Sequence, residues 1–285
     1  MYRSRTMKLS SFLFAMLYAY AVLSLQAEAK TPQGEVKGHA SAHDAVSSRK
    51  AISNAQIALP GSVTGGDIYL GLLKNAPTLL DKKVPVVVFL HGSSGLGLQA
   101  IGQWQQWLAG LGIASLAPDS FALPDRLAYK SPVGKDIYEK IHALRSSEIN
   151  LAIQALKTIP WADSQRLALA GASEGSVAVA RYSGEAFAGR IIFSWSCENN
   201  YFVASPDTAV LDGRPIINVI SASDPYFSSA NEWLGNASAK GNCIEAFKGH
   251  ANASVVLIPD APHTLLNLPM ARQAVAAFLA NLFRL

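Results

Sequence analysis

From residue 54 onward, continuous apolar runs alternate with stretches of helical spacing. "VPVVVFL" (84–90), "IASLAPDS" (113–120) and "RLALAGAS" (166–173) are apolar at nearly every position, as in strands buried on both faces of a sheet. Further strands are predicted at 190–196, 215–223 and 253–260, and helices at 98–112, about 137–158, 174–182 and within 264–285. This alternation predicts βαβ units and a mostly parallel central sheet with helices on both faces, an α/β fold.

The segments outside these βαβ units predict a hairpin, one more helix and a flexible leader. "AQIALP" and "DIYLGLLK" flank "GSVTGG", which predicts an antiparallel hairpin before the parallel strands. "YFSSANEWLG" (226–235) is predicted to be helical. Residues 30–53 are polar and lack clear periodicity, so they are interpreted as a flexible leader. We therefore expect one large domain over residues 54–285, without an internal repeat or a second core.

The first 29 residues have the pattern of a secretory signal. A basic start, "MYRSRTMK", precedes an apolar run, and "AEA" supplies small residues for cleavage before Lys30. The alternative is an uncleaved anchor, because the apolar run approaches spanning length. The sequence thus predicts an exported protein, periplasmic or secreted, with no membrane attachment once the signal is removed.

Charge and cysteine usage narrow the class of protein. The chain of 285 residues has a formal charge of +4 and is 50% hydrophobic. Loss of residues 1–29 removes three basic residues and one acidic residue, which leaves +2. No basic run with interleaved aromatic residues occurs, so nucleic-acid binding is not expected.

Cys197 and Cys243 lie in the exported part and are predicted to form a disulfide; the alternative is two separate thiols.

The segment "GASEGS" (171–176) joins a predicted strand to a predicted helix. In this context G-x-S-x-G is a nucleophile elbow, in which two glycines permit a tight turn and the serine hydroxyl is exposed at its tip. Ser173 is the predicted nucleophile. The backbone N–H of Glu174 falls at the helix start, where it can stabilise a developing oxyanion.

A serine hydroxyl needs a base, and the base needs a carboxylate. His263 follows the last predicted strand and is the candidate base. Asp224, in "SASDPYF", follows an earlier strand and is the candidate carboxylate. Asp260 is the competitor, but it lies only three residues before His263 and would require the chain to fold back. The predicted catalytic residues are therefore Ser173, Asp224 and His263.

The loop "FLHGSSGLG" (89–97) follows an early strand and can supply the second oxyanion donor. Its glycines permit close approach of the backbone to a substrate oxygen. The N–H of Ser93 is the predicted donor, and the N–H of Ser94 is the alternative.

The order Ser173, Asp224, His263, with "HGSSG" and "GASEG" at these positions, resembles the α/β-hydrolase superfamily. The "SDP" and "PH" contexts resemble the dienelactone hydrolase family within it, over roughly residues 55–285. The resemblance implies a sheet of up to eight strands and ester or lactone hydrolysis through an acyl-enzyme, without a metal or organic cofactor. Dienelactone hydrolases proper have a cysteine at the elbow, so Ser173 points to a serine ester hydrolase.

Other predictions concern the substrate, a small-molecule ester or lactone. Residues 198–213 are too few for a large cap domain. Arg126 and Tyr129 follow the strand that ends near Asp119 and are candidate substrate-binding residues, together with Lys130; a solvated loop is the alternative.

On the long helix, His142, Arg145 and Glu148 recur every three residues and predict a polar network that includes Glu174. The alternative functions are a peptidase or acyltransferase with the same triad, or an inactive hydrolase fold that serves as a binding protein.

Overall fold

The computed structural model describes residues 32–285. The predicted signal at residues 1–29 lies outside the described residues. Within residues 32–285, no helix combines the length and the apolar character needed to span a bilayer.

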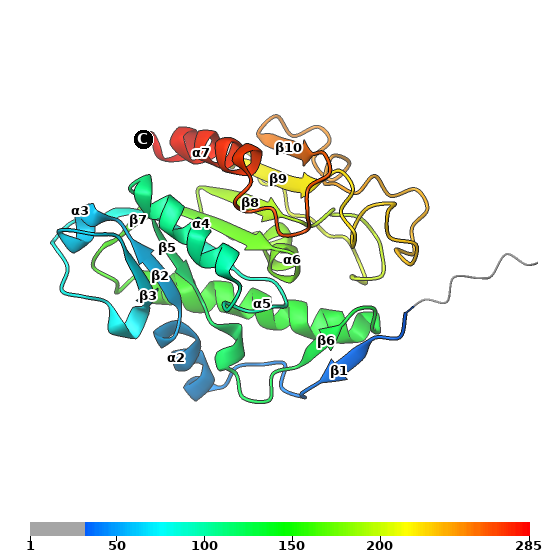
Figure 1. Cartoon of the computed structure of the whole chain (residues 1–285), viewed down its shortest axis with the longest axis horizontal. Coiled ribbons are helices and arrows are strands. Elements are labelled where there is room, and N and C mark those ends of the chain that lie inside the picture. The colour runs from blue at the N-terminus through cyan, green and yellow to red at the C-terminus, as the bar shows by residue number, and fades with distance from the viewer. Residues whose placement is uncertain (1–31) are drawn as a thin grey trace, which may run out of the picture. The chain divides into compact units, whose positions relative to one another are not determined.

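An eight-stranded sheet forms the centre of the described unit, in the order β10-β9-β8-β7-β4-β5-β2-β3 (Figure 1). Neighbouring strands from β10 to β5 are parallel, whereas β2 is antiparallel to both β5 and β3. The mostly parallel sheet and the antiparallel hairpin are therefore confirmed. The strands are β2 (Gln56–Leu59), β3 (Tyr69–Leu72), β4 (Val84–Leu90), β5 (Ala114–Ala117), β7 (Ala162–Ala172), β8 (Gly189–Phe193), β9 (Ile216–Ser221) and β10 (Ala253–Ile258).

Helices cover both faces of this sheet, as predicted (Figure 1). They are α2 (Ala45–Ser53), α3 (Gly61–Thr64), α4 (Gln99–Gly110), α5 (Lys135–Leu156), α6 (Glu174–Arg181) and α7 (Pro269–Phe283), with 3₁₀ turns at Leu73–Asn75 and Ser120–Ala122.

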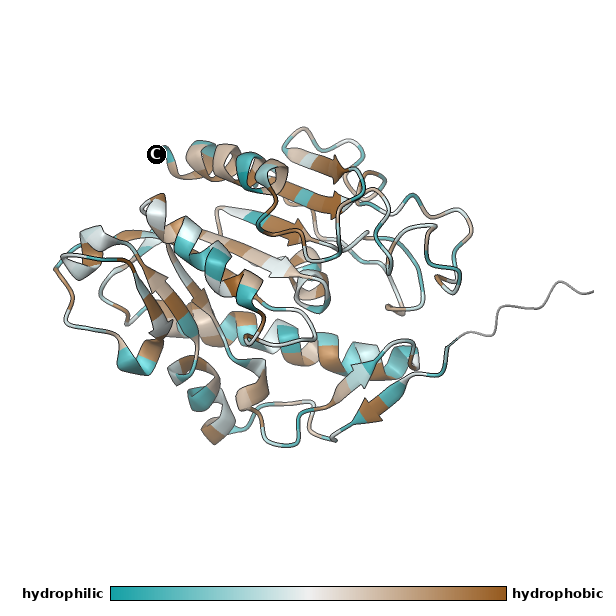
Figure 2. Cartoon of the chain, in the orientation of Figure 1, coloured by the Kyte–Doolittle hydropathy of each residue, from teal (hydrophilic) through white to brown (hydrophobic). Residues whose placement is uncertain are grey.

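Strand β4 shows how the two cores arise. Because successive side chains of a strand point to opposite faces, Val86 and Val88 enter the core beneath α5 and α6. Val87 and Phe89 enter the core beneath α4 and α7. Figure 2 shows that the central strands are accordingly apolar almost throughout. The continuous apolar runs of the sequence follow from this burial on both sides.

The prediction of a flexible leader over residues 30–53 is wrong for residues 32–53. β1 (Glu35–Lys37) pairs antiparallel with β6 (Ala128–Lys130) in a small second sheet. Helix α2 then packs against α5. The folded domain therefore includes residues 32–53 and does not begin at residue 54.

Polar contacts hold this segment, which explains why it shows little hydrophobic periodicity. The side chain of Asp44 accepts a hydrogen bond from the Ser47 N–H at 2.6 Å, and Ser47 reciprocates as the other half of a capping box. The buried ring of His43 bonds to Glu148 on α5 at 3.1 Å.

The predicted helix at residues 226–235 is also absent, and successive turns replace it. Side-chain oxygens at each turn accept backbone N–H groups that a helix would use. Asp224 accepts from the N–H of Phe227, Ser228 from that of Ala230, and Asn231 from that of Trp233. Short polar side chains compete with helical hydrogen bonding in this way.

The parallel strands place the candidate catalytic residues at one edge of the sheet. Strands β4, β7, β9 and β10 end at the same edge because they run in the same direction. The segments that follow them carry the HGSSG loop, Ser173, Asp224 and His263. These residues are therefore close together although His91 and His263 are 172 positions apart in the sequence.

Candidate active site

Ser173 stands between the end of β7 and the start of α6, with a strained backbone. Its φ is 53° and its ψ is −117°, a positive-φ conformation that non-glycine residues rarely adopt. Its side chain forms no capping hydrogen bond to α6. The turn therefore presents the hydroxyl and does not use it for structure.

The two glycines of the elbow are required by close packing. A Cβ at Gly171 would come within 2.7 Å of the Gly175 backbone, and a Cβ at Gly175 would come within 2.2 Å of the Leu90 carbonyl oxygen. Real Cβ atoms do not approach backbone so closely. The two glycines therefore allow α6 to pack closely against the ends of β7 and β4, and the tight turn predicted from the sequence is present.

His263 lies on the loop after β10 and is oriented by Asp224. Its Nδ1–H donates to Oδ2 of Asp224 at 2.8 Å, and the carboxylate is fully buried. Asp224 in turn accepts backbone N–H groups of Tyr226 and Phe227 at its other oxygen. Asp260 makes no such contact and is exposed. The structure therefore pairs His263 with Asp224, as predicted.

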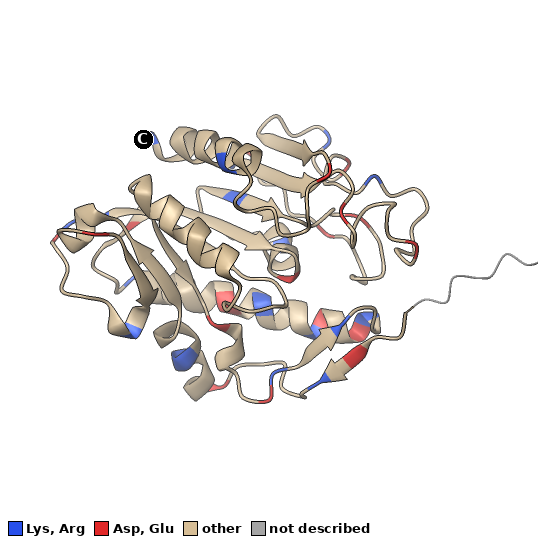
Figure 3. Ribbon diagram, in the orientation of Figure 1, with Lys and Arg blue, Asp and Glu red and all other residues tan. Residues whose placement is uncertain are grey.

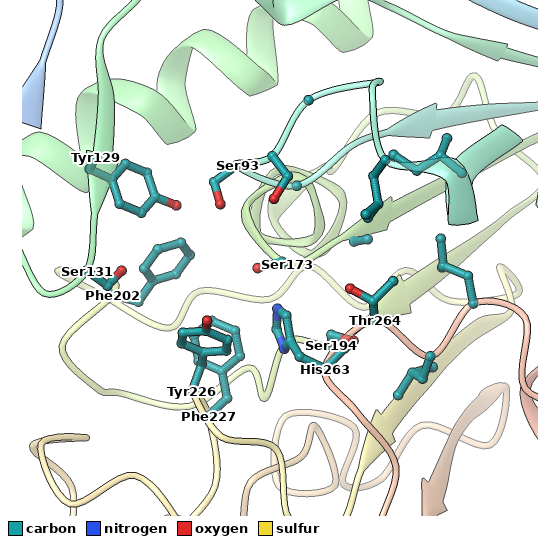
Figure 4. A pocket seen from close by; sticks show the side chains of 18 of the residues that line it. Ser93, Tyr129, Ser131, Ser173, Ser194, Phe202, Tyr226, Phe227, His263 and Thr264 are labelled. Carbon is teal, nitrogen blue, oxygen red and sulfur yellow. The ribbon is translucent and has the colours of Figure 1, made fainter.

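Ser173, His263 and Ser93 line one cavity of about 410 Å³. In Figure 4 the hydroxyl of Ser173 lies beside the imidazole of His263, and the Ser93 side chain points into the same space. With Nδ1 occupied by Asp224, Nε2 is the ring nitrogen left for Ser173. The site holds a serine, a histidine and a carboxylate in the order of a catalytic triad.

The predicted oxyanion donors come from two backbone segments beside Ser173. Glu174 is the first residue of α6, where an N–H has no intrahelical acceptor. In the HGSSG loop, the Gly95 N–H donates to the Gly92 carbonyl at 3.1 Å and closes a turn. The N–H groups of Ser93 and Ser94 stand outside that hydrogen bond, so both remain candidates for the second donor.

Comparison with known proteins gives a match in structure and none in sequence. No protein-family model matches the chain, and no curated protein is similar to it. A solved structure of a protein assigned as a dienelactone hydrolase, from Klebsiella pneumoniae, superposes with a TM-score of 0.53 at 17% identity, over 73% of this chain and 90% of that one. The chain has the α/β-hydrolase fold.

Two further structures agree with this hydrolase fold. Est1E from Butyrivibrio proteoclasticus, solved with ferulic acid, has a TM-score of 0.52 at 16% identity and covers 81% of this chain and 96% of its own. TT1662 from Thermus thermophilus has a TM-score of 0.52 at 17% identity, with coverage of 72% and 91%. The resemblance to dienelactone hydrolases predicted from the sequence is thus confirmed in the fold.

Beneath the elbow, the structure has a buried group of charged side chains. The Glu174 carboxylate accepts a hydrogen bond from Arg126 at 2.6 Å and lies 3.6 Å from Arg145. Arg145 also pairs with Glu148, which bonds to His43 at 3.1 Å. Figure 3 shows that α5 carries charges of both signs, whereas α4 has none. Two arginines and two glutamates balance in charge here, as buried ions require.

The prediction that Arg126 binds substrate is wrong. Its guanidinium is buried, donates to Ser120, the Leu127 carbonyl and Glu174, and does not line the cavity. Lys130, in contrast, lines the cavity; its side chain is exposed and its Nζ lies 3.0 Å from Glu35. The predicted network of Arg145, Glu148 and Glu174 is confirmed, but the nitrogens of His142 have no hydrogen-bond partner in it.

Arg145 also holds the HGSSG loop through His91. One guanidinium nitrogen donates to the His91 carbonyl at 3.0 Å, and another lies 3.4 Å from Nε2 of the same ring. Burial and the nearby charge of Arg145 lower the pKa of His91 well below its usual value. His91 is therefore neutral, donates from Nδ1 to the Gly92 carbonyl at 2.7 Å, and stiffens the loop without reaching the substrate.

Tyr129, the other predicted substrate-binding residue, does line the cavity. Figure 4 shows its hydroxyl directed inward. Burial and the neighbouring carboxylate of Glu174 raise its pKa well above the usual value, so the phenol stays protonated. Tyr129 is thus a neutral donor and an aromatic surface for a ligand.

The sequence interpretation missed four aromatic residues of the cavity: Tyr201, Phe202, Tyr226 and Phe227. A signal was present, because "YF" occurs twice and each time on a segment that follows a parallel strand. Strands β8 and β9 precede these pairs and end at the active-site edge. Aromatic pairs in such loops are candidates for a pocket wall.

The predicted disulfide is present. Cys197, just after β8, is bonded to Cys243 on the long segment between β9 and β10, at a sequence separation of 46. Both cysteines are buried near Trp195 and Phe227. The bond therefore fixes the two irregular segments that carry the aromatic pairs.

Reduction of this bond is expected to lower the free energy of unfolding by about 2 to 4 kcal/mol, because a closed loop of this length restricts the unfolded chain. Denaturant unfolding with and without a reductant measures the change. The double variant Cys197→Ala/Cys243→Ala is the control, and its stability should not respond to the reductant. Equal stability of the oxidised and reduced wild type would contradict a structural role for the bond.

Proposed function

We propose that this protein is a serine hydrolase that cleaves a carboxylic ester or lactone through an acyl-enzyme. One observation carries the proposal: Ser173 is held at a strained strand-to-helix turn, without a structural hydrogen bond to its side chain, in a cavity with a histidine that Asp224 orients at 2.8 Å. Strain of this kind is maintained by the surrounding fold and is found where a reactive group must be presented.

In the proposed mechanism, Nε2 of His263 takes the proton of Ser173 as its oxygen attacks the ester carbonyl. The carbonyl oxygen becomes an oxyanion, which the N–H groups of Glu174 and of Ser93 or Ser94 stabilise. The imidazolium, stabilised by Asp224, returns the proton to the leaving alkoxide as the C–O bond breaks. A water molecule then gives its proton to His263 and attacks the acyl-enzyme, which releases the acid and regenerates Ser173.

The choice of an ester or lactone rests on two kinds of support. Structures with the same fold include a protein assigned as a dienelactone hydrolase and one solved with ferulic acid. The described part of the chain also forms no large cap domain, since the segment between β8 and β9 is short. An alkoxide leaves more readily than an amine, so a triad of this kind is sufficient for ester cleavage.

A fluorophosphonate probe tests the nucleophile directly. We expect stoichiometric labelling of the wild type, with the adduct on the peptide that contains Ser173. An ester and an anilide of the same acyl group then separate esterase from peptidase activity, and the ester should be cleaved much faster. Absence of the adduct would reject the serine hydrolase. Equal cleavage of the anilide would favour a peptidase.

We further propose that residues 1–29 direct export and are cleaved before Lys30. Their layout supports this proposal, and a Cys197–Cys243 disulfide is expected mainly in oxidising compartments. Amino-terminal sequencing of the protein from a cell fraction outside the cytoplasm tests it. A start at Met1 would show that the segment is retained.

A further inference from the structure

The walls of the active-site cavity differ in chemistry on the two sides of Ser173. Tyr129, Tyr201, Phe202 and Phe227 belong to the core beneath α5 and α6. The aliphatic lining residues Ile101, Leu265 and Leu266 belong to the other core, beneath α4 and α7. Because these cores lie on opposite faces of the sheet, Ser173 stands at the boundary between them.

The aromatic half is a continuous wall that ends at the triad. The Tyr129 ring lies 6.0 Å from that of Phe202, which lies 5.3 Å from that of Phe227. Tyr226 packs edge-to-face on His263 at 4.6 Å. In Figure 4, Tyr129, Phe202 and Tyr226 gather on one side of Ser173, and Thr264 lies on the other. Such an array favours a planar ring, which can stack or pack edge-to-face.

The aliphatic half begins at Leu98, next to α4, and continues to Leu265 and Leu266 on the loop that carries His263. Leu98 is 37% exposed, so this half opens to solvent at the rim. Its flexible, non-aromatic surface suits an alkyl chain, and it provides no ring to stack on a planar group.

The cavity offers no buried charge for a charged substrate. Among the described residues that line it, Lys130 is the one permanently charged side chain, and it is exposed and lies 3.0 Å from Glu35, which Lys37 also contacts. Arg126 is buried against Glu174 and does not line the space. A substrate carboxylate buried beside the rings would lose hydration without gaining a buried ion pair, which costs free energy.

We propose, on the basis of the hydrolase function above, that the substrate is an uncharged ester that joins an aryl-bearing group to an alkyl group. The aryl ring occupies the wall of Tyr129, Tyr201, Phe202 and Tyr226. The alkyl chain extends over Leu98, Ile101 and Leu265, and the ester carbon lies at Ser173.

Three uncharged esters test this division. Ethyl hydrocinnamate and phenethyl propanoate are isomers with the ring on the acyl or the alcohol side, and hexyl propanoate is aliphatic on both sides. We expect kcat/KM for the better phenyl isomer to exceed that for hexyl propanoate by about tenfold, the value of one or two good ring contacts. Monoethyl succinate, which carries a free carboxylate, should be the poorest substrate.

Substitutions test which half of the cavity binds the aryl group and which half binds the alkyl group. Tyr129→Leu should lower the ratio of phenyl to hexyl kcat/KM by about threefold to tenfold, and Leu98→Ala should raise it because the hexyl chain loses its contact. Ile244→Ala, an exposed apolar residue elsewhere, is the matched control and should leave the ratio unchanged. Should Tyr129→Leu fail to fold, Tyr226→Leu gives the same readout from a ring that is 41% exposed.

The outcomes separate this inference from the function on which it rests. If Ser173 is labelled by the fluorophosphonate and all esters are cleaved, but the ratio is the same in Tyr129→Leu and Ile244→Ala, the aryl assignment is overturned. If Ser173 takes no label and no ester is cleaved, the hydrolase proposal itself fails.

Discussion

Replacing Ser173 with alanine is expected to lower kcat/KM for ester hydrolysis by about 10⁴-fold or more, with little loss of stability. The hydroxyl makes no capping contact, so its removal deletes the attacking oxygen and leaves the turn with a residue of similar size. Steady-state kinetics on the best ester, together with thermal unfolding, measure the two effects separately.

Ser93→Ala is the matched control for this experiment. Ser93 lines the same cavity, but its proposed contribution is its backbone N–H, which alanine retains. Its activity should therefore stay within about tenfold of the wild type, a much smaller loss than removal of the nucleophile causes. A Ser173→Ala variant that keeps most of its activity, or a Ser93→Ala variant that loses as much, would refute the assigned roles.

Replacing Arg145 with methionine is expected to lower the free energy of unfolding by about 3 to 5 kcal/mol. The side chain is fully buried and pairs with Glu148 while lying 3.6 Å from Glu174. Its removal leaves buried negative charge without compensation, which is far more costly than the loss of an exposed pair. Esterase activity should fall too, because Arg145 also bonds to the His91 carbonyl.

Arg166→Met is the control for the loss of an arginine–carboxylate pair as such. Arg166 bonds to Asp163 at 2.7 Å, but its side chain is 37% exposed, so we expect a cost below about 1 kcal/mol. Denaturant unfolding of both variants measures the difference. If both lose the same small amount, then burial of the charges beneath the elbow does not contribute to stability as described.

The triad arrangement could be predicted because each residue follows its own buried strand. Apolar runs locate parallel strands in the sequence, and parallel strands end at one edge. Ser173, Asp224 and His263 could therefore be placed together without knowledge of their side-chain contacts. The fold class could be predicted from the same pattern, because a strand that is buried on both faces is apolar at consecutive positions.

The role of Arg126 could not be predicted, because its partner is set by tertiary packing. Its contact with Glu174 depends on the placement of β6, α5 and α6 relative to one another, and no local pattern encodes that. Residues 32–53 escaped prediction for a related reason. Their order comes from one capping box, a three-residue strand pairing and the buried bond of His43, none of which requires amphipathic periodicity.

The pairing of β1 with β6 has a consequence for where the functional unit begins. Val36 on β1 is opposite Tyr129 on β6, so the far end of the aromatic wall depends on residues near the amino terminus of the folded domain. A truncated protein that starts at residue 54 would retain every member of the triad. It would lack both the strand that positions Tyr129 and the histidine that bonds to Glu148. Residues 32–53 thus shape the wall of the cavity and complete the buried charges beneath the elbow, although none of them belongs to the triad.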